Sequence, residues 1–287
     1  GFPKIALKLY EKAEEMMPGA SYEYQKALLY GELGDIKKMY SSYVDMVSRT
    51  PSYLPTVKQL LGRALSQETN TENSDYLKEL LIEKIQKGGS ESLNDLLIYV
   101  LIQEENFTGA FIQLKALDRR NASNKGEIYK LGKVALNNHD YDLAQKIFAY
   151  VIKAGPEYPF YESALTMLSK LSLLMPNNQV ISLNHGNALL ESGHYEQAST
   201  VLQDFLLVNP GNYIAYDILT TIYRKQGKKG LEHITKAEVF ALLGAYKKAI
   251  DELHTSYNFL EDQPLLQKRV KARILQFQEQ EDKLKRL

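Results

Sequence analysis

The chain has 287 residues and contains neither cysteine nor tryptophan. Without cysteine it forms no disulfide, presents no thiolate nucleophile and holds no cysteine-ligated zinc. An excess of charge of one sign is also missing: lysine plus arginine number 35 and aspartate plus glutamate number 35, so the formal net charge is zero. Proteins that bind nucleic acid usually carry a basic excess or a basic stripe. The balance therefore disfavours nucleic acid as a partner.

Long apolar runs are missing as well. The stretch 96–102 is among the longest, and it is far shorter than the about 20 residues that span a bilayer. We therefore expect no membrane insertion. No basic-then-apolar leader opens the chain, which begins Gly1-Phe2-Pro3 directly in a helical pattern, so we interpret the start as that of a trimmed or mature fragment. Hydrophobic residues make up 44% and charged residues 24%, which is enough to build a core.

A repeated pattern runs through the sequence instead. Prolines that end helical stretches recur at Pro18 and Pro51, 33 residues apart, and at Pro176 and Pro210, 34 residues apart. In phase with them, turn residues precede an aromatic residue and then an alanine, in the segments 139–144, 193–198 and 244–249. Glycine or asparagine ends a helix by adopting a left-handed conformation, and proline stops the next one. The small residues Gly132 and Gly186 are expected where paired helices cross closely.

These motifs resemble those of the tetratricopeptide repeat family, over nearly the whole chain. The resemblance implies an all-α fold, a right-handed superhelical α-solenoid of tetratricopeptide-type helix pairs. No strand pattern competes, and residues 69–74 are expected to form a polar loop. We predict helices over 3–17, 20–33, 36–49, 53–67, 74–88, 91–105, 107–120, 125–138, 141–154, 158–174, 178–192, 195–208, 212–226, 230–243, 246–260 and 264–285.

The alternation of first and second helices fails in the middle of the chain. Pro156 and Pro176 are only 20 residues apart, so a single helix, from Pro159 to Leu174, fits between them and is expected to serve both roles. A second half-step separates Gly227 from Gly244, which lie 17 residues apart. We therefore predict four parts: an N-terminal array (1–158), a junction helix (159–174), a C-terminal array (175–263) and a capping helix (264–287), for which a basic membrane-surface helix is the alternative.

The two halves resemble different tetratricopeptide proteins. Motifs at 53–57, 63–65 and 109–119 resemble proteins common in Bacteroidetes. Motifs at 184–189, 233–244 and 272–274 resemble the repeat domain of the periplasmic β-barrel assembly-enhancing metalloproteases. Two hypotheses follow: an engineered fusion of two solenoids, or a natural irregular array. The resemblance of the C-terminal half implies a periplasmic location and a role in assembling outer-membrane proteins; an engineered chain would be cytoplasmic.

No catalytic constellation is recognisable, and we expect no enzyme, no cofactor and no metal site. The five histidines include no His-Glu-x-x-His pair, and His185 is interpreted as a partly buried structural residue. Gly88-Gly89-Ser90 and Gly227-Lys228-Lys229-Gly230 follow no predicted strand, so helix termination explains both better than phosphate binding does.

The function that the repeats favour is a scaffold that binds proteins or peptides. In such stacks the first helices line the concave face, where asparagine, tyrosine and scattered charge suit a peptide. The alternative is an engineered chimeric repeat protein with a structural role only. The register predicts concave-face contacts at Tyr24, Tyr99, Tyr129, Lys133, Asn137, Asn187, Glu191, Asp217, Thr221, Arg224 and Lys225. Oligomeric state is not predicted.

Overall fold

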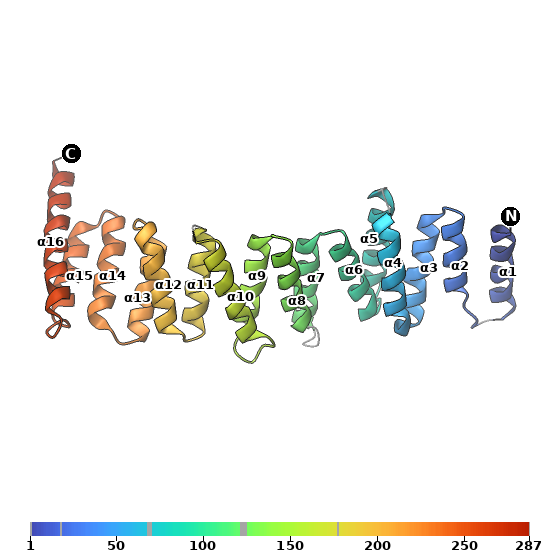
Figure 1. Ribbon diagram of the computed structural model, residues 1–287, viewed down its shortest axis with the longest axis horizontal. Coiled ribbons are helices and arrows are strands. Elements are labelled where there is room, and N and C mark those ends of the chain that lie inside the picture. The colour runs from blue at the N-terminus through green and yellow to red at the C-terminus, as the bar shows by residue number, and fades with distance from the viewer. Residues whose placement is uncertain (1, 18, 68–70, 121–124, 177, 287) are drawn as a thin grey trace. The chain divides into compact units, whose positions relative to one another are not determined.

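The computed structural model describes residues 2–17, 19–67, 71–120, 125–176 and 178–286. Within them the chain forms α-helices and one short 3-10 helix, and no β-strand. The helices form two compact units, residues 1–124 and 125–287, shown as ribbons in Figure 1. The predicted all-α stack of helix pairs is confirmed.

In the first unit each helix contacts near neighbours in the chain, as stacked helix pairs do. α3 contacts α2, α5 and α6, and its buried face carries Tyr40 and Val44. Fully buried leucines of the following helices continue this core. The elements are α1 (Pro3–Met16), α2 (Glu23–Glu32), α3 (Ile36–Arg49), η1 (Pro51–Tyr53), α4 (Leu54–Gln67), α5 (Thr71–Gln86), α6 (Glu91–Gln103) and α7 (Phe107–Arg120).

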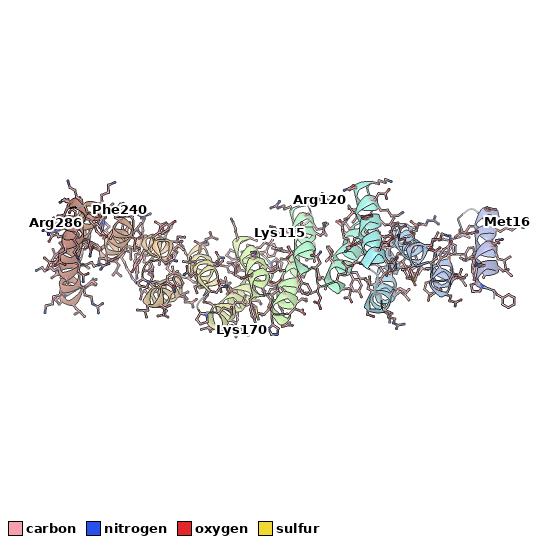
Figure 2. The ribbon with its side chains drawn as sticks, turned by 90° about the horizontal axis from the view of Figure 1, so that it is seen from above. Met16, Lys115, Arg120, Lys170, Phe240 and Arg286 are labelled. Atoms are coloured by element: carbon pink, nitrogen blue, oxygen red, sulfur yellow. The ribbon has the colours of Figure 1, made fainter. Side chains whose placement is uncertain are left out.

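In the second unit α11 contacts α12 and α13, and α13 contacts α14, so helix pairs stack side by side (Figure 1). The side chains of this unit are drawn in Figure 2, where Phe240 of α14 and Arg286 are labelled. The elements are α8 (Lys125–Asn137), α9 (Tyr141–Lys153), α10 (Tyr161–Leu174), α11 (Gln179–Glu191), α12 (Tyr195–Val208), α13 (Tyr213–Lys225), α14 (Lys229–Leu242), α15 (Tyr246–Tyr257) and α16 (Pro264–Lys285).

The turns between paired helices form as their sequences predict. Gly193 has φ 80°, a left-handed conformation that costs glycine no Cβ clash. Its N–H donates to Leu190 O at 3.1 Å, and the N–H of His194 donates to Leu189 O at 2.8 Å, so the last carbonyls of α11 are satisfied. At the start of the next pair, the Asn212 side chain caps α13 by accepting from the N–H of Ala215 at 3.0 Å.

Glycine also permits the predicted close crossing inside a pair. A Cβ on Gly132 of α8 would lie 2.7 Å from Phe148 Cε1 and 2.9 Å from Ile147 Cγ2 of α9. Real Cβ atoms do not approach other atoms so closely. The α8–α9 pair therefore requires glycine at this position.

The polar segment 69–74 was wrongly predicted to be a loop. α5 begins at Thr71, so at least residues 71–74 are helical. Polar residues are tolerated in a first turn, where backbone N–H groups lack helical partners and an acidic side chain such as Glu72 is favourable. Lys37 of α3 also holds Glu72, with Nζ 2.6 Å from Oε1. The rest of that prediction lies outside the described residues.

A single helix, α10, lies between Pro156 and Pro176, and it begins at Tyr161, a little later than predicted. It contacts both α9 before it and α11 after it, and α9 also contacts α11. Phe160, just before the helix, has φ 67°, which explains the late start. The boundary between the two compact units lies at 124/125, whereas the predicted junction lies at 159–174. The first is defined by contacts within each unit, and the second was predicted from sequence resemblance. The four predicted parts therefore stay a prediction.

The last helix packs one face on its neighbour. Val270, Ile274 and Phe277 of α16 are buried against residues of α14 and α15. The opposite face is exposed and strongly charged. Arg273 forms two contacts with Glu238 of α14, 2.7 Å from Nε to Oε1 and 2.5 Å from Nη2 to Oε2. A paired guanidinium of this kind fixes the angle of α16 as well as its position.

Candidate functional site

A cavity of about 340 Å³ opens between α2, α3 and η1 in the first unit. We call it the Tyr24 pocket. Tyr24 and Tyr53 contribute the aromatic part of its wall, and both rings stay partly in solvent, at 40% and 47% exposure. Such half-exposed aromatic rings offer large apolar area to a partner at low entropic cost. The lining residues are Ser21, Glu23, Tyr24, Gln25, Met46, Arg49, Thr50, Tyr53 and Thr56.

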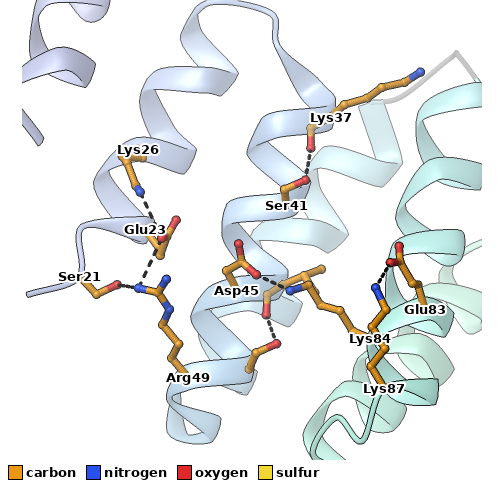
Figure 3. Close-up of polar contacts among 12 residues, drawn as sticks. Ser21, Glu23, Lys26, Lys37, Ser41, Asp45, Arg49, Glu83, Lys84 and Lys87 are labelled. Atoms are coloured by element: carbon orange, nitrogen blue, oxygen red, sulfur yellow. Dashed lines mark hydrogen bonds and ion pairs between the residues drawn. The ribbon is translucent and has the colours of Figure 1, made fainter. Parts of the chain in front are cut away.

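Charged side chains form one side of this pocket. Glu23 is 6% exposed, and its Oε1 lies 3.1 Å from Lys26 Nζ and 3.7 Å from Arg49 Nη1. Lys26 Nζ also lies 2.9 Å from Glu14 Oε2. Figure 3 shows Arg49 reaching from α3 toward Glu23 and Ser21 on the α2 side. Two carboxylates and two cations balance, so the pocket carries no large net charge.

The pKa values in this network follow from its contacts. Burial opposes the ionisation of Glu14, but the N–H of Tyr22 and the ammonium of Lys26 outweigh it, so the pKa of Glu14 is lowered. For Lys26 burial likewise opposes the charge, and the two carboxylates outweigh it, so the pKa is raised. Lys26 therefore stays charged and ion-paired with Glu14 and Glu23. The more exposed Arg49 guanidinium is the cation that faces the pocket.

The register that predicted Tyr24 missed Arg49, Tyr53 and Glu23. These residues belong to a second helix, to η1 and to the start of α2, and only the packing of α2 on α3 brings them together. One feature of the sequence could have pointed to two of them: Arg49 and Tyr53 lie on either side of Pro51, which ends a repeat.

Tyr99 of α6 is predicted to be a groove residue, and the structure places it half-buried across from α4. A Cβ on Gly62 would collide with its hydroxyl, so α4 and α6 meet at this point. Lys58 Nζ lies 5.7 Å from the ring centroid, and burial raises the pKa of the Tyr99 hydroxyl.

The predicted residues of α8 fall into two environments. Tyr129 is 8% exposed, and its ring stacks on Phe160 with centroids 4.9 Å apart and contacts Phe148 at 5.8 Å. Tyr129 therefore occupies a packing position, where its ring has little surface to offer a partner. Lys133 and Asn137, four residues apart on the same helix face, are exposed.

The remaining predicted residues lie on α11 and α13, two helices in contact. Asn187 donates from Nδ2 to Glu191 Oε1 at 3.1 Å. Thr221 donates its hydroxyl to the backbone oxygen of Asp217 at 3.3 Å. Arg224 forms an ion pair with Glu232 of α14, with Nε 2.7 Å from Oε1. Lys225, the last of the set, is exposed at the end of α13. We call Asn187, Glu191, Asp217, Thr221, Arg224 and Lys225 the α11–α13 face.

No cluster of three histidine, aspartate or glutamate side chains suited to a metal ion occurs among the described residues. His185 is 5% exposed, and burial lowers its pKa to about 4. Its Nε2 lies 2.9 Å from the Ser169 hydroxyl of α10. This histidine therefore joins α10 to α11 inside the second unit. In the described part of the chain, no helix is long and apolar enough to cross a membrane.

No protein-family model matches the chain. Among curated proteins, the β-barrel assembly-enhancing protease of Escherichia coli K12 is 24% identical over 164 residues, which are 53% of this chain and 34% of that protein. A putative β-barrel assembly-enhancing protease of Vibrio cholerae is 25% identical over 169 residues, 54% of this chain and 35% of that protein. The chain thus spans about a third of the length of the curated relatives it matches.

Solved structures similar to the chain include tetratricopeptide proteins. A tetratricopeptide repeat protein from Parabacteroides merdae matches 87% of this chain and 96% of its own, at 11% identity and a TM-score of 0.25. MamA from Desulfovibrio magneticus RS-1 matches 66% of this chain and 96% of its own, at 17% identity and a TM-score of 0.30. The resemblance to tetratricopeptide proteins that the sequence predicts is therefore confirmed.

Proposed function

We propose that this chain is a protein-binding scaffold without catalytic activity, and that it receives segments of other proteins at the Tyr24 pocket and along the α11–α13 face. The observation that carries the proposal is the Tyr24 pocket itself. It combines two half-exposed tyrosines with an exposed guanidinium and a buried, fixed carboxylate. Binding surfaces for peptides are built from such rigid aromatic anchors and a few placed polar groups.

The chemistry of the pocket indicates how a peptide would be held. The rings of Tyr24 and Tyr53 would cover an apolar or aromatic side chain. The guanidinium of Arg49 would donate hydrogen bonds to a backbone carbonyl or a carboxylate, because it has five N–H donors and, among the described residues, makes only long contacts, at 3.5 and 3.7 Å. Glu23 would keep Arg49 oriented toward the pocket.

The α11–α13 face supports the proposal independently. Its amide and its charges stand on consecutive first helices, where an extended peptide could pass from one helix to the next. Acidic Glu191 ends α11, whereas α13 carries acidic Asp217 and, nearer its C-terminal end, basic Arg224 and Lys225. Charges of both signs would set the orientation of a bound segment.

Photo-crosslinking tests the proposal. A benzophenone amino acid placed at Tyr24, and in a second variant at Thr221, should form crosslinks to discrete proteins of the native host that mass spectrometry can identify. Ile112, an exposed residue of α7 at 60% exposure, serves as the matched control position because it lies outside both surfaces. If Tyr24 and Thr221 yield only the products that Ile112 yields, the proposal is wrong.

The identity of the partners is a finer proposal. The curated relatives are named for β-barrel assembly, and the chain matches them over about half of its own length, so we include β-barrel proteins under assembly among the partners and a periplasmic location among the expectations. The alternative, an engineered fusion with a structural role, also remains a hypothesis. A natural gene that runs continuously through residues 150–175 would exclude the fusion.

A further inference from the structure

A groove lies in the second unit, lined by residues other than those of the Tyr24 pocket and of the α11–α13 face. It encloses about 390 Å³ between α10, α11 and α12. α10 and α12 form its two sides, and α11 and Pro176 contribute to its floor and end. We call it the α10–α12 groove. The lining residues are Ser169, Ser172, Leu173, Pro176, Ser182, His185, Val201, Asp204, Phe205 and Val208.

Large apolar side chains stand in solvent at this groove. Leu173 is 82% exposed and Val208 is 66% exposed, and both line it. Their chain neighbours Leu174 and Leu207 are 61% and 81% exposed. Leu173 and Val208 line the same groove, and exposed apolar side chains gathered in this way mark an interaction site.

The repeat register makes this exposure specific. Leu173 and Leu207 both stand three residues before a repeat-ending proline, 34 residues apart. Leu174 and Val208 stand two residues before the same prolines. The corresponding positions before Pro18, Pro51 and Pro156 hold Glu15 and Met16, Ser48 and Arg49, and Lys153 and Ala154. Among these five prolines, two apolar residues occupy both positions only before Pro176 and Pro210, in the two repeats that build this groove.

The floor of the groove is rigid and partly polar. Phe205 is 4% exposed, and His185 is 5% exposed beneath the groove. The Ser169 hydroxyl lies 2.9 Å from His185 Nε2, while His185 Nδ1 is buried with no hydrogen-bond partner. A buried polar atom without a partner is costly in a finished core. The floor of the groove is therefore well packed, but one of its buried polar atoms, His185 Nδ1, lacks a hydrogen-bond partner.

One charge belongs to the groove. Asp204 of α12 is exposed and lines it, and in the described part of the chain its carboxylate takes part in none of the ion pairs or side-chain hydrogen bonds. The nearest cation along α10, Lys170, is exposed and is not among the lining residues, and Figure 2 shows it at the edge of the molecule. The groove therefore presents apolar walls and a single unneutralised negative charge.

We propose that the α10–α12 groove binds an apolar segment of another protein that carries a lysine or arginine opposite Asp204. Leu173 and Val208 would cover the apolar side chains of the segment, and the carboxylate of Asp204 would select the basic one. Charge complementarity favours this occupant over a purely apolar ligand, which would bury Asp204 without a partner.

The test uses a random peptide library about 12 residues long, displayed on phage and selected on the whole chain. We expect enriched peptides that combine apolar residues with a lysine or arginine. Synthetic copies of them should bind about tenfold more weakly to Leu173→Lys and to Val208→Lys. Both residues are exposed, so these variants should fold. Leu275→Lys on α16, at a leucine 62% exposed, is the matched control and should bind normally.

The charge of Asp204 gives the sharper result. Selection on Asp204→Lys should enrich acidic peptides in place of basic ones, because the preference reverses with the charge. Peptides that bind equally well to both charge states, a library that yields no peptide sensitive to Leu173→Lys, or self-association that the same variant abolishes would each overturn the proposal. Crosslinking at Tyr24 is unaffected by these variants, so this proposal and the scaffold proposal can fail separately.

Discussion

Gly186 of α11 and Leu202 of α12 touch at the crossing of a helix pair. A Cβ on Gly186 would lie 2.7 Å from both Cγ and Cδ2 of Leu202, which is fully buried. The pair is therefore as close as it is because residue 186 has no side chain.

Gly186→Ala should lower the free energy of unfolding by about 1 kcal/mol. The overpacking costs about 1–3 kcal/mol, which exceeds the gain of up to about 1 kcal/mol in helix propensity. Urea unfolding followed by circular dichroism measures the change. Gly211→Ala is the control, because a Cβ there meets no atom within 4 Å. Equal losses in both variants would contradict the close crossing.

The close crossing at Gly186 shows what local sequence can predict. Turn, aromatic and proline spacings predict helix bounds well, because each element begins and ends on its own residues, as α12 does at Tyr195 and Val208. Tyr129 was placed on the surface by the same register, and it is buried because Phe160, from a loop 31 positions later in the chain, stacks on it. No local pattern contains that contact.

The candidate sites depend on such contacts between elements. The Tyr24 pocket needs Arg49 to reach across from α3 to the start of α2. The α10–α12 groove forms only because α10 and α12, which both end before a proline, lie on either side of a floor to which α11 contributes. The sequence shows which residues are available for both sites, including the apolar pairs before Pro176 and Pro210. Only the packing of the helices brings these residues together.

Stability should fall in mild acid because of His185. Its pKa is about 4 in the folded chain, below the ordinary value of 6.5. The unfolded chain therefore binds more protons between these values, so this contribution to stability is complete above the unfolded pKa and is lost as the pH falls toward about 4. From about pH 7 to about pH 5 the loss should approach about 2 kcal/mol.

Urea unfolding at both pH values measures this loss. In His185→Gln the pH dependence should shrink by the same amount, because the titrating group is gone. His254→Gln, at an exposed histidine of α15, should keep the full dependence. An unchanged slope in His185→Gln would mean that other groups titrate in its place.

Arg273 should hold α16 in place. Its guanidinium donates to both carboxylate oxygens of Glu238 on α14. The guanidinium carbon also lies 4.5 Å from the centroid of the Phe277 ring. Arg273→Ala should cost about 1 kcal/mol, a modest value because the arginine is partly exposed. Arg273→Lys should recover only part of it, since an ammonium cannot make the paired contact.

Hydrogen exchange along α16 measures that effect, which should appear as faster exchange of its amides. Arg269→Ala is the control, because Arg269 is exposed on the same helix. If both variants speed exchange equally, the ion pair with Glu238 does not anchor the helix.

The central claim is that the chain binds protein segments through the Tyr24 pocket. The most direct test measures, by calorimetry, the affinity of a synthetic copy of the segment crosslinked at position 24 for the wild-type chain and for Tyr24→Ser. We predict that the variant binds about tenfold more weakly, because a half-exposed aromatic anchor is lost while the fold is kept. Equal affinity for the two chains would contradict the claim.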